Sequence, residues 1–226
     1  FNVSDEENQC LNAISNIKNV AYLKGNAKFA LGIVTGNNKA YISTEKRDGT
    51  EIILKGSDIQ RYGTTPSGNY IRFVPESFQQ VAPVEMYRAK EKLLYRFISE
   101  VPVFTYDNQQ TLSLNSCNIV IPDIDGLEMK YILAILNSSV AAYFISKSFN
   151  SVKLLRSHIE QMPIPVVPVD VQAPIIKKVD RIMNSSENIS GLYEDLDADI
   201  MSVYGLTIAQ VDTIQSALNG KSQFLK

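Results

Sequence analysis

Three cations recur at steps of four residues in the middle of the chain: Arg88, Lys92 and Arg96. If this stretch is helical, that spacing places the three side chains along one line of the helix surface. The apolar residues of the same stretch recur at three- and four-residue steps, which predicts a helix over residues 86–98 with the opposite face in the core. A line of cations could hold phosphate groups, or it could simply keep this face solvated.

The residues that follow predict two strands, 103–106 and 111–121, joined by a polar turn at 107–110. The turn offers amide side chains that can hydrogen-bond to the edges of nucleic-acid bases. Tyr95 and Tyr106 lie close by in sequence and can stack on bases. Amides and aromatic rings among cations favour a nucleic-acid partner over a merely solvated surface.

Two further loops carry side chains suited to base edges. The first is the glycine- and asparagine-rich tip of a hairpin expected over residues 29–42, and the second is a short helical turn expected after Lys55. Glycine and asparagine also suit a tight turn, so the tip has a structural explanation as well. With the turn at 107–110, the predicted base-reading residues are Asn37, Asn38, Lys39, Gln60, Arg61, Tyr62, Asn108, Gln109 and Gln110.

A second cationic segment follows at residues 146–157, which contain three cations and no acid. Its side chains could join the expected line of cations on the 86–98 helix in contacting a phosphate backbone, because such contacts need only positive charge near the surface. The predicted phosphate contacts are Lys55, Arg88, Lys92, Arg96, Lys147, Lys153 and Arg156.

The composition limits how such binding could work. The 226 residues include 22 Lys and Arg against 24 Asp and Glu, a net charge of -2, so binding of nucleic acid would depend on local patches or on a partner domain. Cys10, Cys117 and the single His158 form no zinc-ligand pattern, and we expect two buried thiols in a reducing cytoplasm. No apolar run approaches the ~18 residues of a membrane span, so no membrane partner is expected.

The pattern of elements predicts an α+β fold in which a mixed sheet carries packed helices and a C-terminal helical segment follows. The prolines of residues 162–168 predict a rigid exit, so we place a domain boundary there, between residues 1–168 and 169–226. Because the chain begins with Phe1, we expect a piece of a longer protein. Besides the 86–98 helix, helices are expected at 5–17, 127–136, 140–145, 172–183, 192–203 and 207–218.

Several segments, taken in order, resemble one known family. They are residues 32–42 (GIVTGNNKAYI), 55–62 (KGSDIQRY), 87–97 (YRAKEKLLYRF), 111–116 (TLSLNS), 131–139 (YILAILNSS), 149–158 (FNSVKLLRSH) and 161–165 (QMPIP). The sequence is similar to the TaqI-like C-terminal specificity domain, which is the target recognition domain of type IIG restriction enzymes and adenine-N6 DNA methyltransferases. Several spaced segments in a fixed order are far more specific than any single one.

This resemblance implies that the chain recognises a sequence in double-stranded DNA, opposite a methyltransferase domain of the same parent chain that flips the adenine. The parent would be a DNA adenine methyltransferase, with or without endonuclease activity. Methylases of the family carry a Pro-Pro signature, and this sequence contains no Pro-Pro pair. We therefore expect a non-catalytic, cytoplasmic fragment without a cofactor of its own, while S-adenosylmethionine and Mg²⁺ belong to the missing domains.

Other interpretations stay open. The segment at 161–165 is shared with type I restriction specificity subunits, so the chain could be half of such a subunit. Asp123, Glu128 and Lys130 have the residue types of a metal-dependent nuclease, although the two carboxylates are close in sequence and Glu128 also suits a helix N-terminus. Residues 170–226 could instead be the docking surface of a protein assembly module. His158 has no nucleophile near it in sequence, which favours a structural or phosphate-contacting role.

Overall fold

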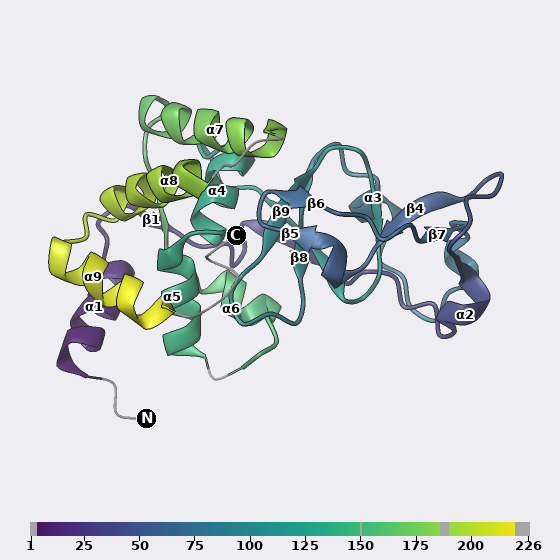
Figure 1. The fold of residues 1–226 in the computed structure, drawn as a ribbon, viewed down its shortest axis with the longest axis horizontal. Helices are drawn as coiled ribbons and strands as arrows, with labels where there is room; N and C mark the ends of the chain where they lie inside the picture. The colour runs from purple at the N-terminus through teal and green to yellow at the C-terminus, as the bar shows by residue number, and fades with distance from the viewer. Residues whose placement is uncertain (1–3, 150, 186–189, 220–226) are drawn as a thin grey trace. The chain divides into compact units, whose positions relative to one another are not determined.

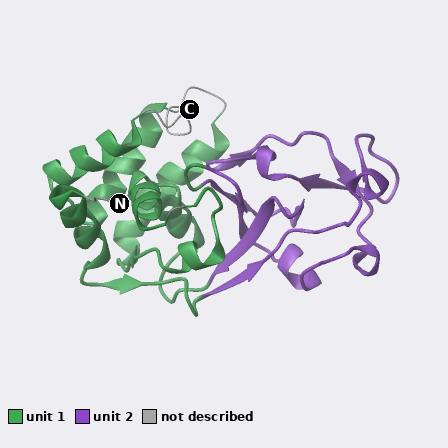
Figure 2. Cartoon of the chain, turned by 90° about the horizontal axis from the view of Figure 1, so that it is seen from below, with its two compact units in different colours: residues 1–26, 100–102, 123–226 green, residues 27–99, 103–122 purple. Residues whose placement is uncertain are grey.

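The structure, a computed structural model, describes residues 4–149, 151–185 and 190–219 (Figure 1). The chain divides into two compact units (Figure 2). Unit 1 comprises residues 1–26, 100–102 and 123–226, and unit 2 comprises residues 27–99 and 103–122. Unit 1 is mainly helical and unit 2 contains most of the strands, so the α+β prediction is confirmed.

Unit 2 contains two four-stranded sheets in its described residues. The first sheet has the order β2-β11-β8-β9 and is antiparallel throughout. The second has the order β10-β4-β7-β3 and is mixed, because β10 runs parallel to β4. The strands are β2 (Ala27–Ala30), β3 (Ile42–Ser43), β4 (Glu51–Leu54), β7 (Tyr70–Ile71), β8 (Lys92–Arg96), β9 (Phe104–Asp107), β10 (Leu112–Ser113) and β11 (Cys117–Pro122).

Short elements connect these strands. β5 and β6 pair with each other as a small antiparallel ribbon. The strand predicted at 111–121 is interrupted between β10 and β11 by a turn in which the Cys117 N–H donates to the Leu114 carbonyl at 2.7 Å. The remaining elements of unit 2 are β5 (Ile59–Gln60), β6 (Gly63–Thr64), the helical turns α2 (Asn38–Tyr41) and α3 (Val84–Tyr87), and the 3-10 turns η1 (Gly56–Asp58) and η2 (Pro75–Ser77).

The helix predicted over residues 86–98 is wrong. Only the turn α3 is helical, it ends before Arg88, and residues 92–96 form strand β8. β8 lies between β11 and β9, and successive residues such as Leu93 and Leu94 are both fully buried, which shows that apolar contacts cover both faces of the strand. A strand buried on both faces lacks the alternation of apolar and polar residues that marks a half-exposed strand. The spacing of its apolar residues was therefore also compatible with a helix. The expected line of cations on a helix therefore does not exist.

The hairpin predicted over residues 29–42 is also wrong. β2 pairs with β11 whereas β3 pairs with β7, so the two expected arms belong to different sheets. The expected tip begins the turn α2 instead, because the Asn37 side chain accepts a hydrogen bond from the Ala40 N–H at 3.3 Å and caps that turn.

Unit 1 is a set of packed helices with one small two-stranded ribbon in its described residues. All the helices predicted for this part of the chain form, with shifted ends; α9 begins with the predicted capping box, in which Thr207 and Gln210 bond to each other's backbone N–H. The elements are α1 (Asp5–Ser15), α4 (Met129–Leu136), α5 (Ser139–Ser148), α6 (Arg156–Glu160), α7 (Val169–Asn184), α8 (Ser190–Val203), α9 (Ile208–Leu218), and the strands β1 (Val20–Ala21) and β12 (Ile164–Pro165).

The boundary predicted between residues 168 and 169 lies inside unit 1. Gln172 of α7 is fully buried and joins the residues on both sides of that boundary. Its Oε1 accepts from the Glu128 N–H at 2.9 Å, and its Nε2 donates to the carbonyls of Gly126 at 2.7 Å and Val167 at 2.9 Å. The first helix of the predicted extension thus packs with α4 rather than apart from it. Residues 186–189 and 220–226 of that extension lie outside the described residues.

Both cysteines are buried and unpaired, as predicted, and burial raises the pKa of each thiol. His158 is also buried, and its ring stacks on Phe149 with centroids 4.2 Å apart, while desolvation lowers its pKa. No single helix in the described ranges is long and apolar enough to cross a membrane; α4 and α5 pass that test only together and are bent by 57° relative to each other. The described residues contain no group of three or more His, Cys, Asp or Glu side chains able to hold a metal ion.

Candidate functional site

A buried ion pair lies at the end of β9, just before the polar turn that the sequence predicted. Lys92 of β8 and Asp107 of β9 face each other directly across the two strands. The Lys92 Nζ lies 2.5 Å from the Asp107 Oδ2, and the two side chains are 0% and 8% exposed. Lys92 Nζ also donates to the Tyr87 carbonyl at 2.8 Å. Burial lowers the pKa of Lys92, and the hydrogen bond and charge of Asp107 oppose that shift.

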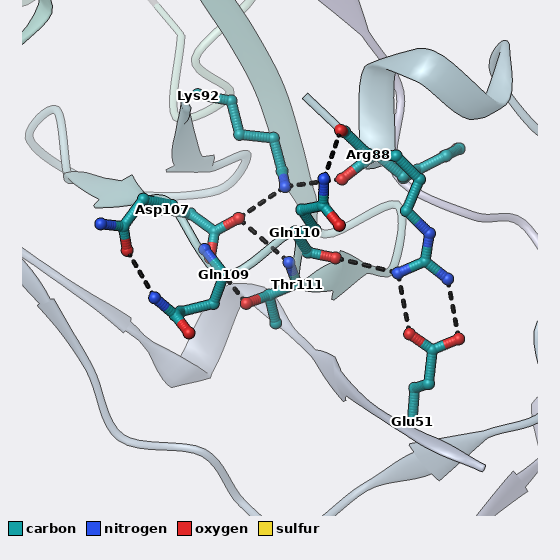
Figure 3. Close-up of polar contacts among 9 residues, drawn as sticks. Glu51, Arg88, Lys92, Asp107, Gln109, Gln110 and Thr111 are labelled. Atoms are coloured by element: carbon teal, nitrogen blue, oxygen red, sulfur yellow. Dashed lines mark hydrogen bonds and ion pairs between the residues drawn. The ribbon is translucent and has the colours of Figure 1, made fainter. Parts of the chain in front are cut away.

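The same carboxylate holds the turn that follows it (Figure 3). Asp107 Oδ2 accepts from the Thr111 N–H at 3.0 Å, and its Oδ1 accepts from the Thr111 hydroxyl at 2.6 Å. Oδ1 also accepts from the Gln109 N–H at 3.4 Å. An Asp side chain that binds backbone N–H groups two and four residues on is a typical way to close a turn. Both oxygens of one buried carboxylate are therefore engaged with the turn.

Arg88 braces the turn from its other end. Its guanidinium binds both carboxylate oxygens of Glu51, at 2.8 and 2.7 Å, and donates to the Gln110 carbonyl at 3.1 Å. In return Gln110 Nε2 donates to the Arg88 carbonyl at 2.8 Å, and Gln110 has a positive φ of 57°. Gln110 is thus committed to holding the turn, although its side chain was predicted to read bases (Figure 3).

Asn108 and Gln109 are exposed, like Gln110, but their side chains are not bonded to Arg88. Gln109 Nε2 donates to Asn108 Oδ1 at 2.8 Å, so the two amides form one unit. That bond uses one N–H of Gln109 and one lone pair of Asn108 Oδ1, so each amide keeps at least one donor and one acceptor. Amide groups with both capacities, fixed on a braced turn, can recognise a partner that offers the complementary pattern.

The predicted loop residues Asn37, Asn38 and Lys39 are all exposed, at the start of α2. The Asn37 oxygen caps α2, and Asn38 Oδ1 accepts from the Thr35 hydroxyl at 2.6 Å. Their amide oxygens therefore serve the local fold, whereas the Lys39 ammonium is carried on an exposed turn.

The predicted segment 60–62 divides between surface and core. Gln60 is exposed and its Nε2 donates to the Thr65 hydroxyl at 3.0 Å, whereas Arg61 is half-buried. Tyr62 is 5% exposed, has a positive φ of 65° and donates its N–H to the Phe104 carbonyl, so it belongs to the core of unit 2. Lys55 is half-buried beside η1.

The predicted phosphate contacts of β8 differ from what a helix would give. Lys92 is fully buried in its ion pair, so its side chain does not reach the surface. Arg96 is half-buried and donates to two backbone carbonyls, those of Gly56 at 3.0 Å and Ile59 at 2.5 Å. Both cations stabilise the interior of unit 2, whereas Arg88 at the turn keeps 29% of its side chain exposed.

The other three predicted phosphate contacts belong to unit 1. Lys147, at the end of α5, forms an ion pair with Glu7 of α1, and this hydrogen bond lowers the pKa of Glu7. Lys153 is exposed in the segment between α5 and α6. Arg156 begins α6, is 61% exposed and pairs with Glu160 at 2.8 Å.

The sequence did not single out three residues that hold the turn: Asp107, Thr111 and Glu51. An aspartate at the end of an expected strand, followed by a polar turn and a threonine, is a local signal for side-chain closure of that turn. Glu51 lies 37 residues from Arg88 and gives no local signal. Asp123 and Glu128, considered for metal binding, are both exposed, and Lys130 pairs with Asp180 at 2.6 Å.

The turn and most of its supports lie in a segment with known relatives. Residues 51–164, half of the chain, match the TaqI-like C-terminal specificity domain. The chain belongs to this family. The resemblance drawn from the spaced segments is therefore confirmed, and the specificity-domain segment includes β8, β9 and the whole turn.

A stretch of 41 residues is 54% identical to the type II methyltransferase M.VspI from Vibrio sp. (strain 343), covering 18% of this chain and 10% of that protein. The specificity-domain fold is also similar to a solved structure of the type IIL restriction-modification enzyme MmeI in complex with DNA, with a TM-score of 0.56, 10% identity, and coverage of 86% of this chain and 35% of that one.

The type IIG restriction endonuclease BpuSI gives a TM-score of 0.53 at 11% identity, over 93% of this chain and 33% of that chain. A structure from a type I restriction-modification system gives 0.50 at 14% identity, over 96% and 52%. At these identities the likeness concerns the fold alone. The chain spans about a third of the two type II enzymes and a tenth of the methyltransferase.

Proposed function

We propose that this chain recognises a sequence in double-stranded DNA and performs no catalysis itself. Its membership of the specificity-domain family supports this proposal. The observation that carries the assignment of a site is the turn between β9 and β10, where Asn108 and Gln109 are exposed while Asp107 before them is buried in its ion pair and Gln110 after them exchanges two hydrogen bonds with Arg88. Asn and Gln side chains are among those that read base edges in the major groove.

The chain would be one part of a larger restriction-modification protein. The similarity to a type II methyltransferase supports a parent with a methyltransferase domain as the partner of this chain, and we propose adenine as the base that it methylates. S-adenosylmethionine and Mg²⁺ would then be used by other domains, in the cytoplasm. In this arrangement the specificity domain chooses the site, while the partner domain extrudes the adenine from the duplex.

Cations and amides have separate roles in this proposal. Exposed Lys39, near the amides of Asn37 and Asn38, and partly exposed Arg88, beside the turn, supply contacts to phosphate that are independent of sequence. The amides of Asn108 and Gln109 supply the dependence on sequence. The net charge of -2 means that these local cations, rather than the overall field of the protein, must hold the DNA.

Replacing Lys39 by alanine is expected to weaken DNA binding equally for all sequences, because the ammonium can contact phosphate only. Binding of the whole chain to a fluorescent duplex of random sequence, titrated between about 50 and 200 mM salt, should show a slope of log K against log salt that is smaller by about 0.9 in the variant.

The matched control is Lys177→Ala, which removes an exposed lysine from α7 of unit 1 and should leave the slope unchanged. Equal slopes for the unsubstituted 226-residue chain and the Lys39 variant would show that Lys39 does not contact DNA. If the unsubstituted chain binds no duplex even at the lowest salt concentration, the proposed function is contradicted.

A further inference from the structure

The buried charge next to the turn is not explained by stability alone. A buried ion pair is often no more stabilising than an apolar pair of similar size, because both ions lose their hydration. Lys92 and Asp107 nevertheless occupy facing positions inside a sheet, where apolar side chains would suffice. What an apolar pair could not do is accept the hydrogen bonds of Thr111 and Gln109.

We propose that Lys92, Asp107 and Thr111 are positioning residues that present the amides of Asn108 and Gln109 as a preformed unit for reading one adenine. This inference rests on the proposed function. Lys92 fixes the carboxylate of Asp107, the carboxylate fixes the backbone of Gln109 and both polar groups of Thr111, and the exposed amides lie between these anchored points.

The anchoring lowers the cost of binding. A loop that must become ordered when its partner arrives spends part of the interaction free energy on that ordering, whereas a loop already held in one conformation does not. Arg88 completes the arrangement at the other end by exchanging two hydrogen bonds with Gln110. The backbone on both sides of Asn108 and Gln109 is therefore fixed before DNA arrives.

The chemistry of the amide unit points to adenine. The bond from Gln109 Nε2 to Asn108 Oδ1 leaves each amide with an acceptor and a donor: Gln109 keeps its Oε1 and a second N–H, and Asn108 keeps both N–H groups and a second lone pair on Oδ1. In the major groove a single guanine presents two acceptors, a single cytosine one donor and a single thymine one acceptor, whereas adenine presents a donor at N6 together with an acceptor at N7. Adenine is the one base whose major-groove edge pairs with both a donor and an acceptor.

The test is selection of duplexes from a pool with a random central segment, using the whole 226-residue chain at low salt and sequencing the bound fraction. The unsubstituted chain should enrich a short motif. Gln109→Ala should lose the preference at one position of that motif, and that position should be adenine. Thr111→Val, which removes only the hydroxyl bound by Asp107, should reduce the preference at the same position by roughly 3- to 10-fold, part of the about 5- to 150-fold that a bidentate base contact supplies.

Thr111→Ser keeps the hydroxyl and should restore the preference, and melting curves of all variants separate positioning from stability. A Thr111→Val motif identical to that of the parent chain would overturn the positioning role, whether or not its melting temperature falls. If Thr111→Val does not fold, Thr111→Ala is compared with Thr111→Ser in the same way. Loss of a base other than adenine in Gln109→Ala would overturn the adenine assignment alone. If the unsubstituted chain enriches no motif, the proposed function itself is overturned.

Discussion

Replacing Lys92 by methionine is expected to lower the free energy of unfolding by about 3–5 kcal/mol, because it leaves the Asp107 carboxylate buried without its counter-ion. The methionine side chain fills similar space, so the loss measures charge rather than volume. Urea unfolding followed by far-UV circular dichroism, with extrapolation to water, gives this free energy directly.

Two variants make that result specific. In Lys92→Met with Asp107→Asn the buried charge is gone and an amide oxygen can still accept from the Thr111 N–H, so at least half of the lost stability should return. Lys177→Met removes an exposed lysine and should change the free energy by no more than about 0.5 kcal/mol. A Lys92→Met chain as stable as the parent would contradict the buried ion pair.

Replacing Gly32 by alanine is expected to destabilise the protein by about 3 kcal/mol or more, at or beyond the upper end of ordinary overpacking. A Cβ atom at Gly32 would lie 2.1 Å from the Leu114 carbonyl oxygen and 2.6 Å from that of Cys117. Both are backbone atoms, one in the turn after β10 and one in the first residue of β11, so they cannot move aside as a side chain tip can. The neighbouring residue Ile33 forms a bridge with Leu114, and this close approach joins the chain after β2 to that turn.

Gly63 is the matched control for this substitution. It also lies in unit 2, its φ is not positive, and a Cβ atom there would meet nothing within 4 Å. Gly63→Ala should therefore change the free energy of unfolding by less than about 0.5 kcal/mol. The comparison is made by thermal or urea unfolding of both variants, and a similar loss in the two would contradict the close packing at Gly32.

The sequence predicted the local features of the site better than the long-range ones. The strand before the turn, the turn itself and its exposed amides follow from composition and from turn-forming residues, which act over a few positions. The role of Gln110 was missed because it depends on Arg88, 22 residues away. The role of Lys92 was missed because a central strand buried on both faces has no distinctive period, so its cation was placed on a helix surface instead of opposite Asp107.

Dependence on distant residues also explains why the sequence did not predict the partners of β2 and β3 or the packing of α7 on the residues before the expected domain boundary. The apolar residues of β2 and β3 were visible in the sequence, but not which strands they pair with, because neither the pairing of Ala30 with Ile119 nor that of Ile42 with Ile71 leaves a local mark. The prolines before α7 do produce an extended segment. What they do not reveal is that the buried Gln172 returns to residues 126–128 through two hydrogen bonds.

The most direct test of sequence reading by this chain is the response of the side-chain NH₂ groups of Asn108 and Gln109 to DNA, observed in ¹⁵N-labelled protein. A duplex carrying the selected motif should shift both pairs of signals, and a scrambled duplex of the same composition should shift them far less, because only base edges distinguish the two. The side-chain signals of Asn184, in unit 1, serve as an internal reference. Equal shifts with both duplexes, or no shift at Asn108 and Gln109 while DNA is bound elsewhere, would contradict the proposal that this turn reads the sequence.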